Sequence, residues 1–286
     1  HGFAPDLWIA SDRGNSSSLP YYQPAIFTRL LSNGNAYRGS SNTNWSGGWG
    51  DSYFKFSDAG VTLTGSHSYL NYSLSPYVYY ALRRAPGFFD EVFFTATGTP
   101  QNIQHGLGVP PELMIVKCYN SSGGFVYAAP VGAGKLLGLM SDQPSTNAAS
   151  NDTVIWNNTA PTDTYFSINT STTFTYSAFL FASLPGVSKI GSYTGNGGSQ
   201  NIDCGFSTGA RFFLVKATST TGDWWMFDSA RGIVSGTENG IRLNSSAPET
   251  AAIDVVDPYA SGITVNQEAT RSINASGVSY IYWAIA

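Results

Sequence analysis

Short runs of β-branched and aromatic residues alternate with polar positions along nearly the whole chain. Clusters of Gly, Asn, Ser and Asp separate these runs at spacings of roughly 8 to 15 residues. Alternation with a period of two is typical of strands that bury one face. The best helical candidate, residues 24–31, is too short for three turns of about 3.6 residues. We therefore expect an all-β protein of antiparallel strands with little helix.

Three sequence patterns recur at intervals of about 100 residues, which indicates internal repeats. The first is a strand entry, the second a closing strand and the third a Pro-Gly junction. The entries are residues 1–9, 105–117 and 204–216; the closing strands are residues 77–81, 176–182 and 280–286; the junctions are residues 85–88 and 184–187. Pro-Gly cannot continue a strand and therefore indicates a boundary.

These patterns predict tandem antiparallel β-sandwich repeats of jelly-roll or immunoglobulin-like type, with roughly six to eight strands each. The predicted domains are residues 1–84, 85–184 and 185–286. The second and third repeats each have a strand-like segment before the entry glycine, and the first has no such segment. A sandwich without its first strand has an unpaired edge and leaves part of its core exposed. We therefore expect either that the natural chain is longer or that another subunit supplies the strand.

Composition narrows the possible classes of function. Charged residues make up 11% of the chain, against about 25% in an average soluble protein, while aromatic residues reach 14%. The formal net charge is -4, and the densest basic pair is Arg83-Arg84. We therefore expect no nucleic-acid partner. No apolar run approaches the roughly 18 residues of a membrane span, so we expect no membrane insertion.

Residues that could carry chemistry are few. Asp90 and Glu91 are adjacent carboxylates at a strand start, where alternation turns them to opposite faces. Asp254 and Asp257 could hold calcium, although an Asp-Pro turn explains them more simply. The histidines have no second metal-ligating residue at a suitable spacing, and no Gly-x-Ser-x-Gly motif occurs. We predict no catalytic residues, no metal site and no cofactor.

Aromatic residues in polar loops are the positive candidates for binding. Exposed rings can stack on sugar faces while Asn and Asp bond the hydroxyls. Packing within the protein, or assembly with a second copy, is the competing explanation. The candidate contacts to carbohydrate or a receptor are Trp45, Trp49, Tyr21, Tyr22, Trp224 and Trp225. Strand alternation would turn one ring of the last two inward and the other toward the surface.

Residues 85–90, 107–117 and 155–162 carry a resemblance to a known family. They resemble a domain of unknown function that is repeated in tail and tail-fibre-like proteins of marine tailed bacteriophages. Residues 187–197, 222–232 and 284–286 look like the C-terminal copy of the same family, whereas residues 1–84 match less well. The resemblance implies a non-enzymatic virion structural protein on the particle surface, with host attachment as its task.

The sequence leaves two classes of function open. The first is a phage tail fibre or surface appendage, located on the virion surface or otherwise extracellular. Its partners would be copies of itself, as a homo-oligomer, and other virion proteins, with a host-surface glycan as a further candidate. The second is a carbohydrate-binding module of a secreted protein, or a strand-exchanged extracellular filament subunit. The two cysteines, Cys118 and Cys204, occupy different positions in their repeats, which predicts buried free thiols.

Overall fold

A computed structural model shows an all-β protein with several antiparallel sheets, as the sequence predicts. This architecture is consistent with the β-sandwich class. The structure describes residues 2–13, 24–31, 36–38, 54–65, 71, 76–119, 123–139, 141–147, 149–150, 153–170, 173–245 and 247–286. One short 3-10 helix, η1 (Ala269–Arg271), occurs in the described part of the chain. No helix there is long and apolar enough to cross a membrane.

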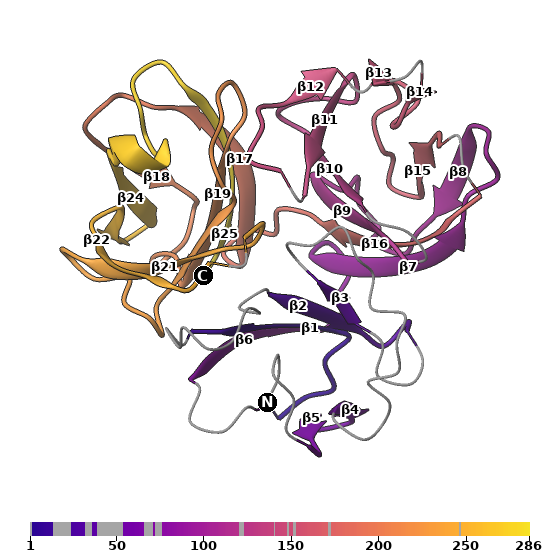
Figure 1. Cartoon of the computed structure of the whole chain (residues 1–286), viewed down its shortest axis with the longest axis horizontal. Coiled ribbons are helices and arrows are strands. Elements are labelled where there is room, and N and C mark those ends of the chain that lie inside the picture. The colour runs from indigo at the N-terminus through magenta and orange to yellow at the C-terminus, as the bar shows by residue number, and fades with distance from the viewer. Residues whose placement is uncertain are drawn as a thin grey trace.

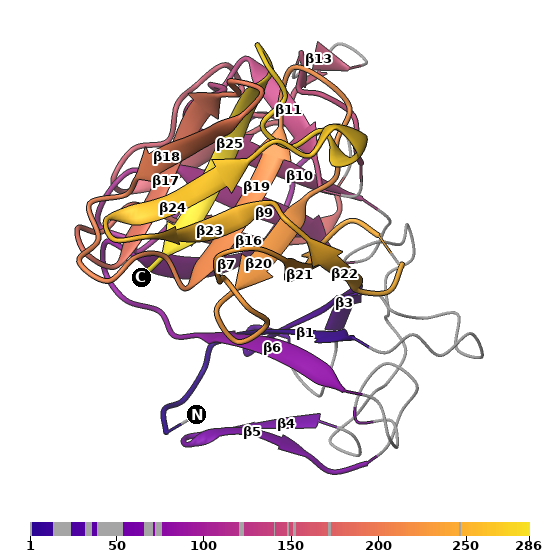
Figure 2. The same cartoon turned by 90° about the vertical axis from the view of Figure 1, so that its left-hand side faces the viewer.

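The strands form three lobes around a common centre (Figure 1). The first lobe has a four-stranded sheet of order β3-β2-β1-β6 and a separate β4-β5 hairpin. Its strands are β1 (Leu7–Asp12), β2 (Ala25–Thr28), β3 (Ala36–Arg38), β4 (Phe54–Ser57), β5 (Gly60–Leu63) and β6 (Tyr77–Leu82). The first lobe lies below the other two in Figure 2.

The second lobe has a six-stranded sheet of order β12-β11-β10-β9-β16-β7, with β15-β8 and β13-β14 pairs beside it. Its strands are β7 (Phe89–Thr95), β8 (Gln101–Gln104), β9 (Leu113–Cys118), β10 (Gly124–Ala128), β11 (Lys135–Gly138), β12 (Thr146–Asn147), β13 (Ala149–Ser150), β14 (Thr153–Val154), β15 (Tyr165–Ile168) and β16 (Thr175–Phe181).

The third lobe combines a six-stranded sheet of order β17-β25-β19-β20-β21-β22 with a three-stranded sheet of order β18-β24-β23. Its strands are β17 (Ser188–Thr194), β18 (Ser199–Asp203), β19 (Phe212–Ala217), β20 (Trp225–Asp228), β21 (Glu238–Arg242), β22 (Thr250–Ile253), β23 (Val256–Tyr259), β24 (Gly262–Asn266) and β25 (Ser279–Ile285). The described parts of the second and third lobes thus contain more strands than the six to eight expected.

The main sheets of the three lobes share one strand arrangement. In each, a central strand pairs with a following hairpin strand on one side and with the closing strand on the other: β1 between β2 and β6, β9 between β10 and β16, and β19 between β20 and β25. The registers agree as well. Leu7 faces Leu82, Leu113 faces Phe181 and Phe212 faces Ile285. Positions in one lobe therefore have defined counterparts in the others.

The central strand of each main sheet, β1, β9 or β19, is buried on both faces. One face packs inside its own lobe, where large side chains such as Phe27, Phe166 and Phe213 are almost fully buried. The other face joins a core shared by all three lobes, which includes Leu7, Phe181 and Trp283. At about 25 cal/mol per Å² of apolar area removed from water, such a shared core holds the lobes together as one body.

The two Pro-Gly segments turn the chain from one lobe into the next. Gly87 and Gly186 have φ values of 73° and 72°, a left-handed conformation that favours glycine. Each turn is closed by an isolated bridge, Ala85 with Phe89 and Leu184 with Ser188. The strands therefore stop at these junctions, as the sequence indicates.

Candidate functional site

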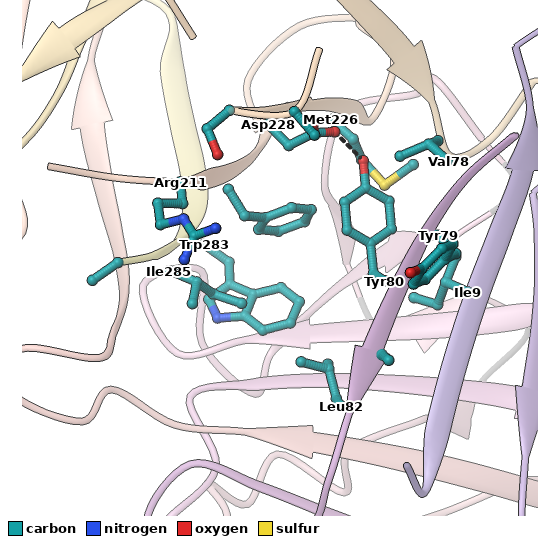
Figure 3. Close-up of a pocket in the computed structure, with 15 residues that line it drawn as sticks. Ile9, Val78, Tyr79, Tyr80, Leu82, Arg211, Met226, Asp228, Trp283 and Ile285 are labelled. Atoms are coloured by element: carbon teal, nitrogen blue, oxygen red, sulfur yellow. Dashed lines mark hydrogen bonds between the residues drawn. The ribbon is translucent and has the colours of Figure 1, made fainter. Parts of the chain in front are cut away.

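A cavity lies between the first and third lobes. It has a volume of about 340 Å³ and is lined mainly by apolar side chains. The first lobe contributes Ile9 and residues 78–82 of β6, and the third lobe contributes the ends of β19, β20 and β25. Tyr80, Phe212 and Trp283 bring aromatic rings to it, with ring centroids of Tyr80 and Phe212 5.1 Å apart (Figure 3).

A charged cluster closes one corner of this cavity. The phenol of Tyr80 donates to Asp228 Oδ2 at 2.7 Å, a contact drawn in Figure 3, and accepts from Arg231 Nη2 at 2.9 Å. Arg231 Nε lies 2.6 Å from the same Asp228 oxygen, and the Arg231 side chain is only 1% exposed. Burial raises the pKa of Tyr80 far above its usual value, so the phenol stays protonated and keeps donating.

The cluster continues through Glu249 to the first lobe. Glu249 accepts from Arg231 Nη1 at 3.4 Å, from Asn239 Nδ2 at 2.9 Å and from Arg13 Nε at 2.9 Å. Arg13 follows β1, so this bidentate ion pair joins the first lobe to the third. Through Tyr80 and Arg13 the network becomes a contact between the first and third lobes. Within it, the buried positive charge of Arg231 is balanced by the carboxylates of Asp228 and Glu249.

The other two contacts between lobes also bury ionisable groups. Thr28 Oγ1 of the first lobe donates to Glu91 Oε2 of the second at 2.6 Å. Lys216 Nζ of the third lobe donates to the carbonyl oxygens of Asp142 and Gln143 of the second, at 3.2 and 2.9 Å. Burial raises the pKa of Glu91 to about 7 and lowers that of Lys216 to about 8. Inter-lobe packing therefore sets the protonation of these side chains.

Replacing Glu91 with glutamine is expected to flatten the dependence of stability on pH. The pKa of Glu91 rises from 4.5 to about 7 on burial, so the folded state holds the proton more tightly than the unfolded chain. The contribution of this group is full below the unfolded pKa and is lost as pH rises through the folded pKa, a loss of about 3 kcal/mol. Urea midpoints of wild type and E91Q at pH 5 and 7.5 measure the difference.

Glu268 offers a matched control for this measurement. Its pKa is lowered, chiefly by the hydroxyl of Thr270, so its contribution has the opposite sign. E268Q is therefore expected to leave the fall in stability between pH 5 and 7.5 in place. If E91Q and wild type lose stability equally over this range, burial does not shift the Glu91 proton equilibrium and the electrostatic account of this interface is wrong.

Of the six residues predicted to contact carbohydrate or a receptor, the structure describes two. Trp45, Trp49, Tyr21 and Tyr22 lie outside the described residues. Trp224 and Trp225 are described, and both are buried, with 1% and 3% of their surface exposed. The expectation that one of this pair makes a surface contact is therefore wrong.

The burial of the tryptophan pair follows from the shared core. The rings do turn to opposite faces, as alternation requires. Trp225 packs in the third lobe's own core, and Trp224 packs in the shared core, where Nε1 donates to the carbonyl of Gly138 in the second lobe at 3.0 Å. A face that alternation alone assigns to solvent is covered by a neighbouring lobe.

The remaining chemical candidates take structural positions. Asp90 and Glu91 diverge as expected, because Asp90 accepts from the amide of Gly106 while Glu91 points to Thr28. Asp254 and Asp257 share the amide of Asn266, at 2.9 and 2.7 Å. No cluster of three or more metal-ligating side chains occurs in the part of the chain that the structure describes.

The two cysteines are buried free thiols, as predicted. Cys204 lies near the phenol of Tyr282, and burial raises its pKa to about 11. A thiol with such a pKa stays protonated near neutral pH and is a poor nucleophile. Cys118 is 3% exposed within the core of the second lobe.

Sequence reasoning missed Tyr80 and Arg231, the central members of the inter-lobe network. One local signal was present: Asp228 and Arg231 are three residues apart after an apolar run and form an ion pair across the turn. Tyr80 belongs to the closing-strand pattern of residues 77–81, and nothing in this pattern predicts that one of its tyrosines bonds a charged side chain. Its contact with Asp228 spans 148 residues, so no local pattern could have predicted it.

Comparisons with known proteins give one match. A family model described as a domain of unknown function (DUF7483) matches residues 84–286. This range spans the second and third lobes. No curated protein and no solved structure matches the chain.

Proposed function

We propose a structural, non-enzymatic role for this chain, which belongs to the family described as a domain of unknown function (DUF7483). The observation that carries the proposal is the core shared by all three lobes. Apolar side chains from each main sheet meet there, and polar networks at each contact reinforce it. A protein built this way holds its lobes in one rigid relation, which suits a stacked element of a fibre or surface appendage.

The lobes are, on this proposal, three copies of one β-sandwich domain in tandem, with boundaries after residues 84 and 184. The agreement of strand order and register supports this view. So do the matching Pro-Gly turns before β7 and β17. Three copies in a single chain would place like faces around one pseudo-threefold axis, as a trimeric fibre segment does with three separate chains.

A virion location completes the proposal. It rests on the resemblance of residues 85–90, 107–117 and 155–162 to repeated domains of phage tail and tail-fibre-like proteins. The chain would then lie on the virion surface, with other virion proteins and copies of itself as partners and host attachment as its task. The low charge and the abundance of polar uncharged residues suit a surface exposed to the medium.

Immunogold electron microscopy tests this location. Antibodies raised against the purified chain are expected to label intact virus particles from the source culture at tails or surface appendages. As a control, the same antiserum is first adsorbed with the purified chain and then applied to the same virus preparation. This adsorbed serum should give no label. Label confined to cell surfaces or to secreted polysaccharide would contradict the virion role and support the carbohydrate-binding alternative, in which Trp45 and Trp49 are the first residues to test.

A further inference from the structure

A small polar pocket lies on the second lobe, where strand β8 pairs with β15. Its volume is about 250 Å³, and its lining residues are Pro100, Gln101, Asn102, Asn157 and Ser167. The β8–β15 pair is on the outer side of this lobe, away from the centre where the three lobes meet (Figure 1). Because Pro100, Asn102 and Asn157 are exposed, the pocket is accessible from solvent.

The two strands place polar side chains opposite each other at this pocket. Asn102 of β8 and Ser167 of β15 are cross-strand partners, and so are the next pair, Ile103 and Phe166. Because successive strand residues turn to opposite faces, Asn102 and Ser167 lie on the face turned away from the core that buries Phe166. Asn157 reaches this face from the segment before β15, and its Nδ2 donates to Ser167 Oγ at 3.3 Å. Two amides and a hydroxyl therefore line one face.

These groups keep hydrogen-bonding capacity that the protein does not use. The side-chain amide of Asn102 makes no hydrogen bond within the part of the chain that the structure describes. Ser167 is only 3% exposed and accepts from Asn157, so its own proton is available to a group that enters the pocket. The amide oxygen of Asn157 has no donor among the described residues. The pocket thus offers donors and acceptors together on a small surface.

The corresponding place in the third lobe has these groups paired with each other. The Gln-Asn-Ile run at residues 101–103 recurs at residues 200–202, and β18 pairs with β24 as β8 pairs with β15. Asn201 and Thr264 are therefore the counterparts of Asn102 and Ser167. Thr264 Oγ1 donates to Asn201 Oδ1 at 2.7 Å, so the hydroxyl proton and the amide oxygen are both occupied.

The third member of the group differs in the same sense. The carbonyls of Ile155 and Val255 accept from the residues that follow β15 and β24, which makes Asp257 the counterpart of Asn157. Both carboxylate oxygens of Asp257 have donors within the third lobe, a backbone amide at 3.0 Å and a side-chain amide at 2.7 Å. The third lobe thus uses these positions for its own structure, whereas the second lobe leaves them available to a ligand.

The chemistry of the pocket selects a neutral ligand that is rich in hydroxyl groups. None of the five lining residues is ionisable, and a charged group would lose water there without gaining an opposite charge. An amide presents a donor and an acceptor side by side, which matches two adjacent hydroxyls of a sugar ring. Pro100 adds an apolar surface for the C–H groups of such a ring. A volume of about 250 Å³ suits a single ring, because drug-sized ligands need pockets of about 300 Å³ or more.

We propose that this pocket binds one neutral sugar unit of a host-surface polysaccharide. The Asn102 amide bonds two adjacent hydroxyls, and Ser167 with Asn157 bonds a third from the floor of the pocket. The choice of a host polysaccharide rests on the proposed attachment function, whereas the preference for a neutral sugar rests on the pocket alone. A single site of this size binds weakly, with a dissociation constant on the order of millimolar, so attachment depends on several copies acting together.

Nuclear magnetic resonance of the full chain tests the sugar site directly. The probes are the methyl glycosides of glucose, mannose, galactose, N-acetylglucosamine and rhamnose, each added to isotope-labelled protein. At least one is expected to shift the backbone amide signals of Asn102, Asn157 and Ser167 saturably, while the signals of Asn201 and Thr264 stay in place. Glycerol at the same concentration should shift none of them. If no glycoside moves the three pocket signals, or if glycerol moves them equally, the pocket is not a sugar site.

Three substitutions identify the groups that bind the sugar. Asn102→Ala should weaken binding of the responding glycoside by about tenfold or more, because the ring loses a donor and an acceptor at once. Asn201→Ala is the matched control, an exposed asparagine at the equivalent place in the third lobe, and should leave binding unchanged. Asn157→Gly removes the second amide but keeps the left-handed backbone at φ 50°, so it should weaken binding without unfolding the lobe. Equal affinities of wild type, N102A and N157G would reject the assignment.

A competition experiment tests the source of the sugar. Polysaccharide extracted from the host surface should displace the responding glycoside from the wild-type chain, and failure to displace it would overturn the host polysaccharide as the ligand. The pocket and the proposed location can fail separately. Labelled virus particles without any glycoside response would reject the sugar site alone, whereas glycoside binding by a chain that does not label particles would reject the attachment role and leave the sugar-binding pocket in place.

Discussion

Replacing Trp283 with alanine is expected to reduce the free energy of unfolding by about 3 to 5 kcal/mol, the usual cost of a large cavity in a close-packed core. The Trp283 side chain is 4% exposed and lies 4.4 Å from the ring centroid of Phe181 in the second lobe and 5.3 Å from that of Phe212. It also lines the small central space that Leu7 and Ile26 border from the first lobe. Urea unfolding followed by tryptophan fluorescence measures the loss.

Phe166 provides a control of similar size inside a single lobe. It is fully buried in the second lobe's own core and belongs to no inter-lobe cluster. F166A should cost a similar free energy but speed hydrogen exchange mainly in the second lobe, whereas W283A should speed exchange in all three. If W283A leaves exchange in the first lobe unchanged, the shared core does not couple the lobes.

Arg231→Met is expected to destabilise the protein by about 3 to 5 kcal/mol, because it leaves the buried Asp228 carboxylate without its positive partner. Asp228 and Glu249 both bond the Arg231 guanidinium, and Tyr80 also loses a donor. Thermal unfolding at pH 7.5 measures the loss.

Arg271 is the matched control, because R271M also removes an arginine charge but from a partly exposed ion pair. Its ion pair with Glu268 is 3.1 Å long, and the two side chains are 26% and 25% exposed. Because solvent screens such pairs, R271M should cost no more than about 1 kcal/mol. A loss in R231M as small as that in R271M would mean that the buried network contributes little to holding the first and third lobes together.

Strand positions were predictable because they depend on local alternation and turn residues. The closing strand predicted over residues 77–81 is β6, the strand entry predicted over residues 105–117 contains most of β9, and the Pro-Gly turns lie where the strands stop. Leu113 to Val116 are four buried apolar residues in succession, a signal of a strand covered on both faces that alternation alone does not give. That signal predicts a second layer without identifying it.

The inter-lobe site was not predictable in the same way. Asp228 and Arg231 are neighbours in the chain, but Arg13 and Glu249 are separated by 236 residues and Tyr80 and Arg231 by 151. A periodic pattern of neighbouring residues cannot predict contacts between residues so far apart in the sequence. The burial of Trp224 and of Lys216, which a single lobe would leave at its surface, depends on the second lobe lying against the third.

The amino-acid sequence by itself determined that the protein is all-β, where its main strands and junctions lie and that its thiols are buried, because each of these properties is set by side chains within a few residues or by burial of an apolar run. Only the tertiary structure decided which sheet faces meet, which charges are buried and where the cavity beside β6 lies. Those features arise where three sheets converge, and convergence depends on the shape and register of whole lobes rather than on any local pattern.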